Sequence, residues 1–270
     1  MEIEYHYLIL GLIQGLTEFL PVSSSGHLLL FERALLKGIP DSSLLMINVA
    51  FHMGTLIAVI MYFWRDVYSY SSAFLSLFRS RKDSMSENQR EVLMILLLSF
   101  PTGVIGLALK KMNIEAIPLW GVLIALCVTS VVCFGIDRVK VLSSSGNGIT
   151  PIKAVILGLV QGIAVIPGIS RSGSTIFTGL ICGLSREKMA SFSFLMSIPA
   201  ITGAFLLELK ELLELGTQDV HLFSLGAGAL VAMVSGYLSL ALLVRLLKGK
   251  QFKVFGWYCL LVALIGFFII

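Results

Sequence analysis

Charged residues are scarce in this sequence. Only 13% of its 270 residues are Asp, Glu, Lys or Arg, whereas an ordinary soluble domain carries about 25%. The chain is 57% hydrophobic with a mean hydropathy of +0.93, so it cannot present a polar surface to water on all sides. Long apolar runs such as WGVLIALCVTSVVCFGI also lack the alternation of a membrane β-barrel. These absences leave an all-α polytopic membrane protein as the predicted fold class.

Other signals are missing as well. The four cysteines all lie in apolar segments and form no C-x-x-C pair, so we expect neither a disulfide nor a metal site from them. The N-terminus lacks a basic region, and we expect no cleavable signal peptide. No G-x-x-x-x-G-K-[ST] loop is present, so the sequence offers no evident way to use ATP. We also expect no nucleic-acid partner.

Six apolar segments have about the 20 residues that a membrane-spanning helix needs. Two further regions, 7–36 and 152–185, are apolar but are interrupted by Pro, Gly and Ser near their middle. Because proline lacks the amide donor and glycine loosens a helix, we predict that each folds as a re-entrant hairpin of two half-helices. The six predicted full transmembrane helices are 43–64, 91–109, 117–136, 187–208, 221–245 and 252–270.

The distribution of Lys and Arg predicts the orientation. With the N-terminus outside and both hairpins returning to their own side, the inside loops hold 14 of these residues and the outside loops five. This bias follows the positive-inside rule and places both termini on the periplasmic side. The segment 65–90 is then expected to be a cytoplasmic loop, with an interfacial helix as the alternative for part of it.

The two interrupted regions resemble each other. The stretch GLIQGLTEFLPVSSSGH at 11–27 aligns without a gap with GLVQGIAVIPGISRSGS, 147 positions later, with seven identities over 17 positions. Since the first hairpin enters from outside and the second from inside, we predict an inverted-topology repeat within one membrane domain, over about 1–137 and 150–270. Such repeats place their binding site near the bilayer midplane, where the broken helices meet.

The first interruption carries candidate catalytic groups. Gln14 and Glu18 are four residues apart and share one helix face, and a carboxylate inside a membrane segment is a functional candidate by default. The alternative for Glu18 is a structural ion pair with Arg171. For Gln14, a functional role and a structural one are equally compatible with the sequence. In the structural role it would donate a hydrogen bond to a neighbouring helix, as its repeat counterpart Gln161 could.

The residues after Pro21 suit anion binding. Ser23, Ser24 and Ser25 precede the second half-helix, where they could cap its amides or help them bind an anion. His27 lies in the first turn of that half-helix, and we favour a role in proton transfer or nucleophilic attack over a structural one. His52 lies in apolar surroundings and is interpreted as structural.

The second interruption is the most specific signal in the chain. An arginine lies there among hydroxyl groups and a glycine, at a helix N-terminus, and its planar guanidinium matches phosphate in a bidentate manner. A Glu18–Arg171 pair that only locks the hairpins together would not need so many hydroxyls. The candidate phosphate ligands are Ser170, Arg171, Ser172, Gly173, Ser174 and Thr175.

QGLTEFLPVSSSGH and PGISRSGST resemble the two signature motifs of the undecaprenyl pyrophosphate phosphatase family, the bacitracin-resistance proteins of bacterial inner membranes. Gln14 and Glu18 match (E/Q)xxxE, and residues 167–175 match PGxSRSxxT. The resemblance implies hydrolysis of a polyprenyl pyrophosphate lipid to its monophosphate, which recycles the carrier for peptidoglycan synthesis and confers bacitracin resistance. It also implies dependence on Mg²⁺ or Ca²⁺ with Glu18 as a ligand.

The same resemblance implies that Glu18, His27 and Arg171 are indispensable and that Ser24 is a candidate nucleophile. From the sequence, attack could equally come from Ser24, from His27 or from water. A lipid-phosphate transporter or flippase is the alternative function, because broken helices in inverted repeats are common in transporters. The glycine-rich segment GAGALVAMVSG would permit close helix packing, and a homodimer is compatible with it.

Overall fold

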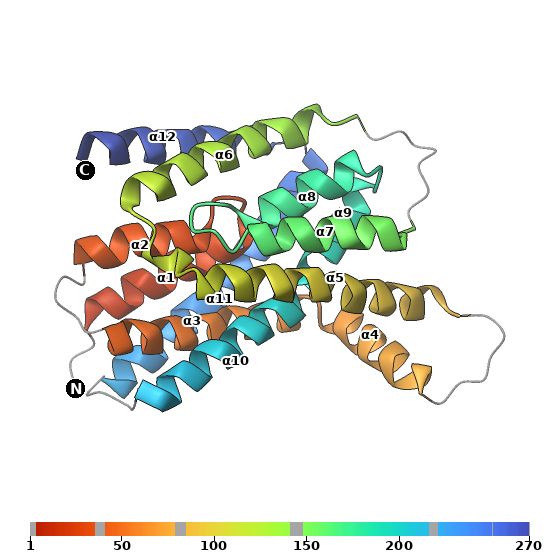
Figure 1. The fold of residues 1–270 in the computed structure, drawn as a ribbon, viewed down its shortest axis with the longest axis horizontal. Coiled ribbons are helices and arrows are strands. Elements are labelled where there is room, and N and C mark those ends of the chain that lie inside the picture. Colours follow the sequence, from red (N-terminus) through yellow and green to blue (C-terminus); the bar gives the residue numbers. More distant parts are fainter. Residues whose placement is uncertain are drawn as a thin grey trace.

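In the computed structural model, residues 4–35, 41–78, 85–140, 148–215, 221–249 and 251–269 are described, and every regular element among them is helical. Most helices run roughly along the long axis of the molecule (Figure 1). In chain order they are α1 (Tyr5–Phe19), α2 (Ser24–Leu35), α3 (Asp41–Tyr62), α4 (Trp64–Leu77), α5 (Glu87–Lys111), the 3₁₀ turn η1 (Ile114–Ala116), α6 (Leu119–Arg138), α7 (Pro151–Ile163), α8 (Arg171–Ile181), α9 (Arg186–Leu195), α10 (Ser197–Leu215), α11 (Leu222–Gly249) and α12 (Lys253–Ile269).

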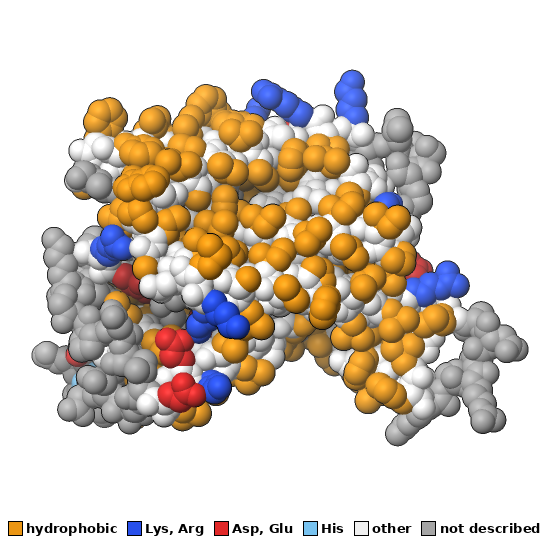
Figure 2. Space-filling model, viewed as in Figure 1, with side chains coloured by type: hydrophobic (Ala, Val, Ile, Leu, Met, Phe, Trp, Pro, Cys, Tyr) orange, Lys and Arg blue, Asp and Glu red, His pale blue; other side chains and the backbone are white. Residues whose placement is uncertain are grey.

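Five of the six predicted spans are helices long and apolar enough to cross a membrane. One of them, Arg186–Glu214, combines α9 and α10, which are separated only by a break at Met196. The sixth, α12, has 17 described residues, about 26 Å at 1.5 Å per residue and somewhat less than the ~30 Å hydrocarbon core. Hydrophobic side chains cover much of the face in Figure 2, as expected of a surface in contact with lipid. The chain is therefore a multi-pass helical membrane protein.

Both regions that the sequence predicts to be interrupted are pairs of short helices. α1 ends at Phe19 and α2 begins at Ser24, whereas α7 ends at Ile163 and α8 begins at Arg171. Left-handed backbone occurs in each connection, at Ser23 with φ 72° and at Gly168 with φ 96°, and the two helices of each pair pack against each other. The helix breaks are thus confirmed, while their return to the same membrane face and the inverted order of the repeats stay predictions.

The segment 65–90, expected to be a cytoplasmic loop with an interfacial helix as the alternative for part of it, is partly helical. α4 covers 64–77 and α5 begins at Glu87; residues 79–84 lie outside the described residues. α4 exposes Trp64, Tyr68 and Leu75, an apolar face that favours the alternative of an interfacial helix. The Tyr70 hydroxyl of α4 donates to the Glu91 carboxylate of α5, and burial together with this hydrogen bond raises the pKa of Tyr70.

Glycines bring several helix backbones into contact. A Cβ on Gly11 of α1 would lie 2.2 Å from the carbonyl oxygen of Gly228 in α11, and one on Gly228 would lie 2.7 Å from the carbonyl oxygen of Tyr7. A Cβ on Gly158 of α7 would lie 2.3 Å from the Leu98 carbonyl oxygen of α5. Part of the glycine-rich segment 226–236 is therefore used to pack α11 against α1 within the chain, as small residues do between membrane helices.

Candidate active site

The two helix breaks meet tip to tip. A Cβ on Gly26 would lie 2.9 Å from the Gly168 Cα, and one on Gly173 would lie 3.2 Å from the Pro21 Cβ. The Gly168 amide also donates to the Ser23 hydroxyl at 3.1 Å. The close approach explains why small residues occupy this junction, since any larger side chain would push the two turns apart.

Helix α6 holds both turns in place. The Thr129 hydroxyl donates to the Gly168 carbonyl at 2.7 Å and accepts from the Ser170 amide at 2.9 Å. The Cys133 thiol, one helical turn further along, contacts the Pro21 carbonyl at 3.2 Å. These side chains satisfy backbone groups that the breaks leave without helical partners, which a buried irregular segment requires.

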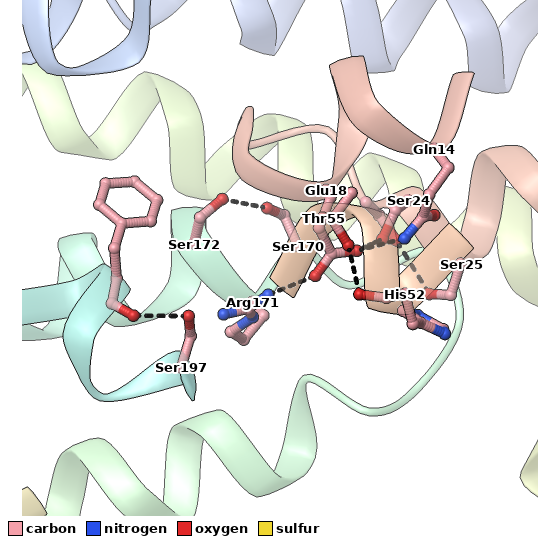
Figure 3. A network of polar contacts seen from close by, with 12 residues as sticks. Gln14, Glu18, Ser24, Ser25, His52, Thr55, Ser170, Arg171, Ser172 and Ser197 are labelled. Atoms are coloured by element: carbon pink, nitrogen blue, oxygen red, sulfur yellow. Dashed lines mark hydrogen bonds and ion pairs between the residues drawn. The ribbon is translucent and has the colours of Figure 1, made fainter. Parts of the chain in front are cut away.

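Glu18 is the centre of the polar cluster at this junction (Figure 3). The Arg171 guanidinium of α8 donates to Glu18 Oε1 at 2.5 Å, and the Ser24 hydroxyl of α2 donates to Glu18 Oε2 at 2.6 Å. Gln14 Nε2, one turn earlier on α1, donates to the same Oε2 at 3.2 Å. The Glu18 side chain is 6% exposed and that of Arg171 15%, so the pair is largely withdrawn from solvent. A hydroxyl from the first break and a guanidinium from the second therefore converge on one carboxylate.

The cluster lies on the wall of a cavity of about 700 Å³. Six of the predicted site residues line this cavity, and they come from both breaks. They are Glu18, Ser23, Ser24, Ser25, Ser170 and Arg171. The remaining wall is mostly apolar and comes mainly from α2, α3, α5 and α10, and from the end of α7 with the turn that follows it. A charged headgroup can reach the polar end while an apolar chain lies along the rest.

Some of the predicted phosphate-binding hydroxyls cap helices, and some are buried away from the cavity. Ser23 and Ser170 each accept a hydrogen bond from the amide three residues later, Gly26 at 3.3 Å and Gly173 at 3.2 Å. Thr175 is fully buried and bonds to Ser193 of α9 at 2.7 Å. Four predicted phosphate ligands do not line the cavity, because the first turn of α8 directs them into the protein: Ser172, Gly173, Ser174 and Thr175.

The structure does not bring His27 to the cavity. The cavity-facing residues of α2 are Ser24, Ser25, Leu28, Leu29 and Glu32, a stripe that leaves position 27 on another face. The His27 ring stacks on Tyr258 of α12, with ring centroids 5.5 Å apart. Its Nδ1 donates to the Ser23 carbonyl at 2.8 Å, and its Nε2 lies 2.9 Å from the Tyr258 hydroxyl. Both nitrogens are engaged, so a direct part in the reaction stays a prediction that this placement does not support.

A second polar group on the cavity wall was missed by the sequence interpretation. His52 of α3, interpreted as structural because its neighbours are apolar, faces the cavity and pairs with Glu208 of α10 at 3.2 Å. Glu32 and Asn48 line the same part of the wall, and Glu32 Oε1 has no hydrogen-bond partner among the described residues. The signal that could have found Glu208 is the one used for Glu18, an ionisable residue inside an apolar segment.

The donor set bears on the divalent cation implied by the resemblance. Among the described residues no three His, Cys, Asp or Glu side chains are grouped as a metal site. Beside Glu18, however, Gln14 Oε1 is buried without a hydrogen-bond partner. One carboxylate and one amide oxygen fit a hard cation of the Mg²⁺ type, which takes its other ligands from phosphate oxygens and water.

A helical membrane protein with an arginine, a carboxylate and serines at the junction of two broken helices belongs to the class that binds an anionic group within the membrane. Comparison with known sequences narrows this class. The profile of the bacitracin resistance protein BacA family matches residues 7–265, and the chain belongs to that family.

Curated relatives named undecaprenyl-diphosphatase match nearly the whole chain. The protein of Methanosphaera stadtmanae is 38% identical over 96% of this chain and 95% of its own. That of Desulfosudis oleivorans is 41% identical over 93% of each chain. That of Thermosipho africanus is 39% identical over 98% of this chain and 99% of its own.

Proposed function

We propose that this protein hydrolyses undecaprenyl pyrophosphate to undecaprenyl phosphate and inorganic phosphate. The observation that carries the proposal is the contact of Arg171 and Ser24 with one carboxylate, Glu18, on the wall of a cavity that is otherwise mostly apolar. The name shared by the relatives supports the same activity. The substrate is amphiphilic in the same way as the cavity.

Arg171 has the role of holding the pyrophosphate. Its guanidinium is permanently charged and offers paired donors that match phosphate oxygens. Phosphoryl transfer depends chiefly on positioning and on stabilising negative charge, so removal of this group should cost more than removal of any single hydroxyl. The Glu18 contact keeps the guanidinium oriented toward the cavity before the substrate arrives.

Ser24 is the nucleophile that the geometry favours, with Glu18 as its base. The Ser24 hydroxyl already donates to Glu18 Oε2 at 2.6 Å, within the distance a general base requires. In the first step the proton passes to Glu18, the Ser24 Oγ–phosphorus bond forms, and the anhydride oxygen leaves with the lipid monophosphate. Water then cleaves the phosphoserine and releases phosphate. Direct attack by a water that Glu18 deprotonates is the competing route.

The experiment is phosphate release by the purified protein, with Arg171→Ala, Arg171→Lys and Ser24→Ala as variants. We expect Arg171→Ala to lose about 10³-fold or more in kcat/KM and Arg171→Lys to recover only part of it, because lysine lacks the paired donors. Rapid quenching with labelled substrate should trap a phosphoenzyme that Ser24→Ala lacks. Wild-type activity in Arg171→Ala would remove the phosphate-holding role.

A divalent cation, Mg²⁺ or Ca²⁺, is part of the proposal, held by Glu18 and by the Gln14 amide oxygen. When bound, it supplies positive charge to the phosphate oxygens. We expect EDTA to abolish phosphate release and added Mg²⁺ or Ca²⁺ to restore it. Full activity in excess EDTA would contradict the role of the cation. It would not contradict the roles proposed for Arg171, Ser24 and Glu18 in hydrolysis.

The proposed setting is the bacterial plasma membrane, with both termini outside and the two halves in inverted order. The helix pairs support this arrangement: α1 packs on α11 in the way that α7 packs on α5, as two similar halves related by a two-fold axis would pack. The same arrangement favours lipid-phosphate transport as the second candidate function. Flux of labelled lipid phosphate across proteoliposomes, beside phosphate release, discriminates between the two functions.

A further inference from the structure

Two helices that form much of the mostly apolar cavity wall, α5 and α10, pack against each other only sparsely. α5 contributes Thr102, Gly103, Gly106 and Leu107 to this wall, at the spacing of one helix face. α10 contributes a stretch of small and apolar residues around Gly203. α5 packs extensively on α7 and α10 on α3, but α5 and α10 pack against each other only sparsely. The Lys110–Glu211 ion pair, at 2.7 Å, joins them near the C-terminal end of α5. We call the line between them the α5–α10 seam.

Two glycines at this seam, Gly103 and Gly203, have no packing role among the residues that the structure describes. A Cβ added to Gly103 or Gly203 would meet no atom within 4 Å. The glycines of α1, α7 and α11 differ, because a Cβ at Gly11, Gly158 or Gly228 would run into a neighbouring backbone. A glycine inside a helix costs stability relative to alanine, and close helix packing, the usual compensation in membranes, is absent here. Open space beside Gly103 and Gly203 is what these residues provide.

The cavity reaches the outer surface of the protein at the same seam. Leu107 of α5 lines the cavity and is 46% exposed, and Leu206 of α10 lines it and is 57% exposed. Residues that belong both to the wall and to the outside mark an opening. Both leucines are apolar, so the part of the opening between them suits a hydrocarbon chain better than water or a charged group.

We propose that the α5–α10 seam is the passage through which the prenyl chain of the substrate leaves the cavity for the bilayer, with Gly103 and Gly203 setting its width. The inference rests on the proposed function, because the headgroup at Arg171 and the chain at the seam belong to one molecule. Arg171 and both glycines line one continuous cavity, so a lipid held by its phosphates must direct its tail along this wall. The two glycines determine which chains the enzyme accepts and take no part in bond cleavage.

The test uses Gly103→Leu and Gly203→Leu, with Gly226→Leu as the matched control. Gly226 lies on α11, a Cβ there also meets nothing within 4 Å, and the residue does not line the cavity. Phosphate release is measured with undecaprenyl, farnesyl and isopentenyl pyrophosphates. For the seam variants we expect KM for the undecaprenyl substrate to rise about tenfold, because the leucine fills space that the long chain must occupy, while KM for the isopentenyl substrate is unchanged. The control should match the unsubstituted protein with all three.

Two outcomes would overturn the passage. One is a seam variant that behaves like Gly226→Leu with the undecaprenyl substrate. The other is an equal loss with all three substrates, which would mean that the leucine disturbs the headgroup site. Binding of the same lipids, followed by native mass spectrometry, separates this inference from the proposed function. If the passage exists, both seam variants bind the long-chain lipid more weakly than the unsubstituted protein does, whether or not that protein releases phosphate. A lack of phosphate release by the unsubstituted protein would refute only the proposed hydrolysis.

Discussion

The Glu18–Arg171 pair allows one substitution to test both stability and chemistry. Glu18→Gln keeps the shape of the side chain but removes the charge that Arg171 and Ser24 contact. Removing one partner of a buried ion pair costs about 3–5 kcal/mol. Since Arg171 lines the cavity and its side chain is 15% exposed, water partly compensates the loss. We therefore expect the free energy of unfolding to fall by about 3 kcal/mol, the lower end of that range.

The catalytic effect of the same change should be larger than its effect on stability. If Glu18 takes the proton from Ser24 or from water, kcat should fall by about 10²–10⁴-fold in Glu18→Gln. Phosphate release under saturating undecaprenyl pyrophosphate measures kcat, and denaturation in detergent measures stability. Combining Glu18→Gln with Arg171→Ala should cost less stability than the sum of the single changes, because no buried charge is left unpaired. A Glu18→Gln protein with wild-type kcat would refute the assignment of Glu18 as the base.

Three further changes test the surroundings of the site. His27→Gln should reduce kcat by less than about tenfold and lower the unfolding free energy by about 1–2 kcal/mol, as loss of its two hydrogen bonds predicts. A thousandfold fall in kcat at unchanged stability would instead show that His27 takes part in the reaction. Gly168→Ala should destabilise the protein by about 2 kcal/mol or more in denaturant titrations, because residue 168 has φ +96° and its Cβ would lie 2.5 Å from the Val122 carbonyl oxygen. His52→Gln should lower the thermal midpoint by removing the side chain that Glu208 contacts at 3.2 Å, and Glu208→Gln in the same chain should recover most of the loss. No recovery would show that the pair does not act as a unit.

The helix breaks could be predicted because their causes are local. Proline, glycine and serine near positions 21–26 and 167–173 end one helix and cap the next whatever the rest of the chain does. Segments of about 20 apolar residues likewise identify spans without knowledge of their neighbours. For 64–77 the sequence left a loop and an interfacial helix open, since its polar composition resembles a loop, and the helix is anchored on α5 by Tyr70.

The parts of the site that could not be predicted depend on how each helix is rotated against its neighbours. His27 lies close in sequence to the serines of α2, yet its ring stacks on Tyr258, 231 residues away. His52 and Glu208 are 156 residues apart and meet because α3 packs on α10. Sequence neighbours alone therefore suggested a catalytic role for His27 and a structural role for His52. Glu18 and Arg171 were paired in advance only because each is a charge that needs a partner inside a membrane.

The alignment of the two breaks distinguishes residues that cap the helices from residues that form the candidate catalytic site. With an offset of 147, Ser23 corresponds to Ser170 and Gly26 to Gly173, and both serines accept from the amide of that glycine. The positions that differ supply the candidate catalytic groups. Ser24 corresponds to Arg171, and Glu18 corresponds to an apolar residue, Val165. Identical residues thus build two matching helix starts, while each break contributes groups that the other lacks. A substitution that made the breaks more alike, such as Arg171→Ser, should therefore leave the caps intact and remove the only cation in contact with Glu18 among the described residues.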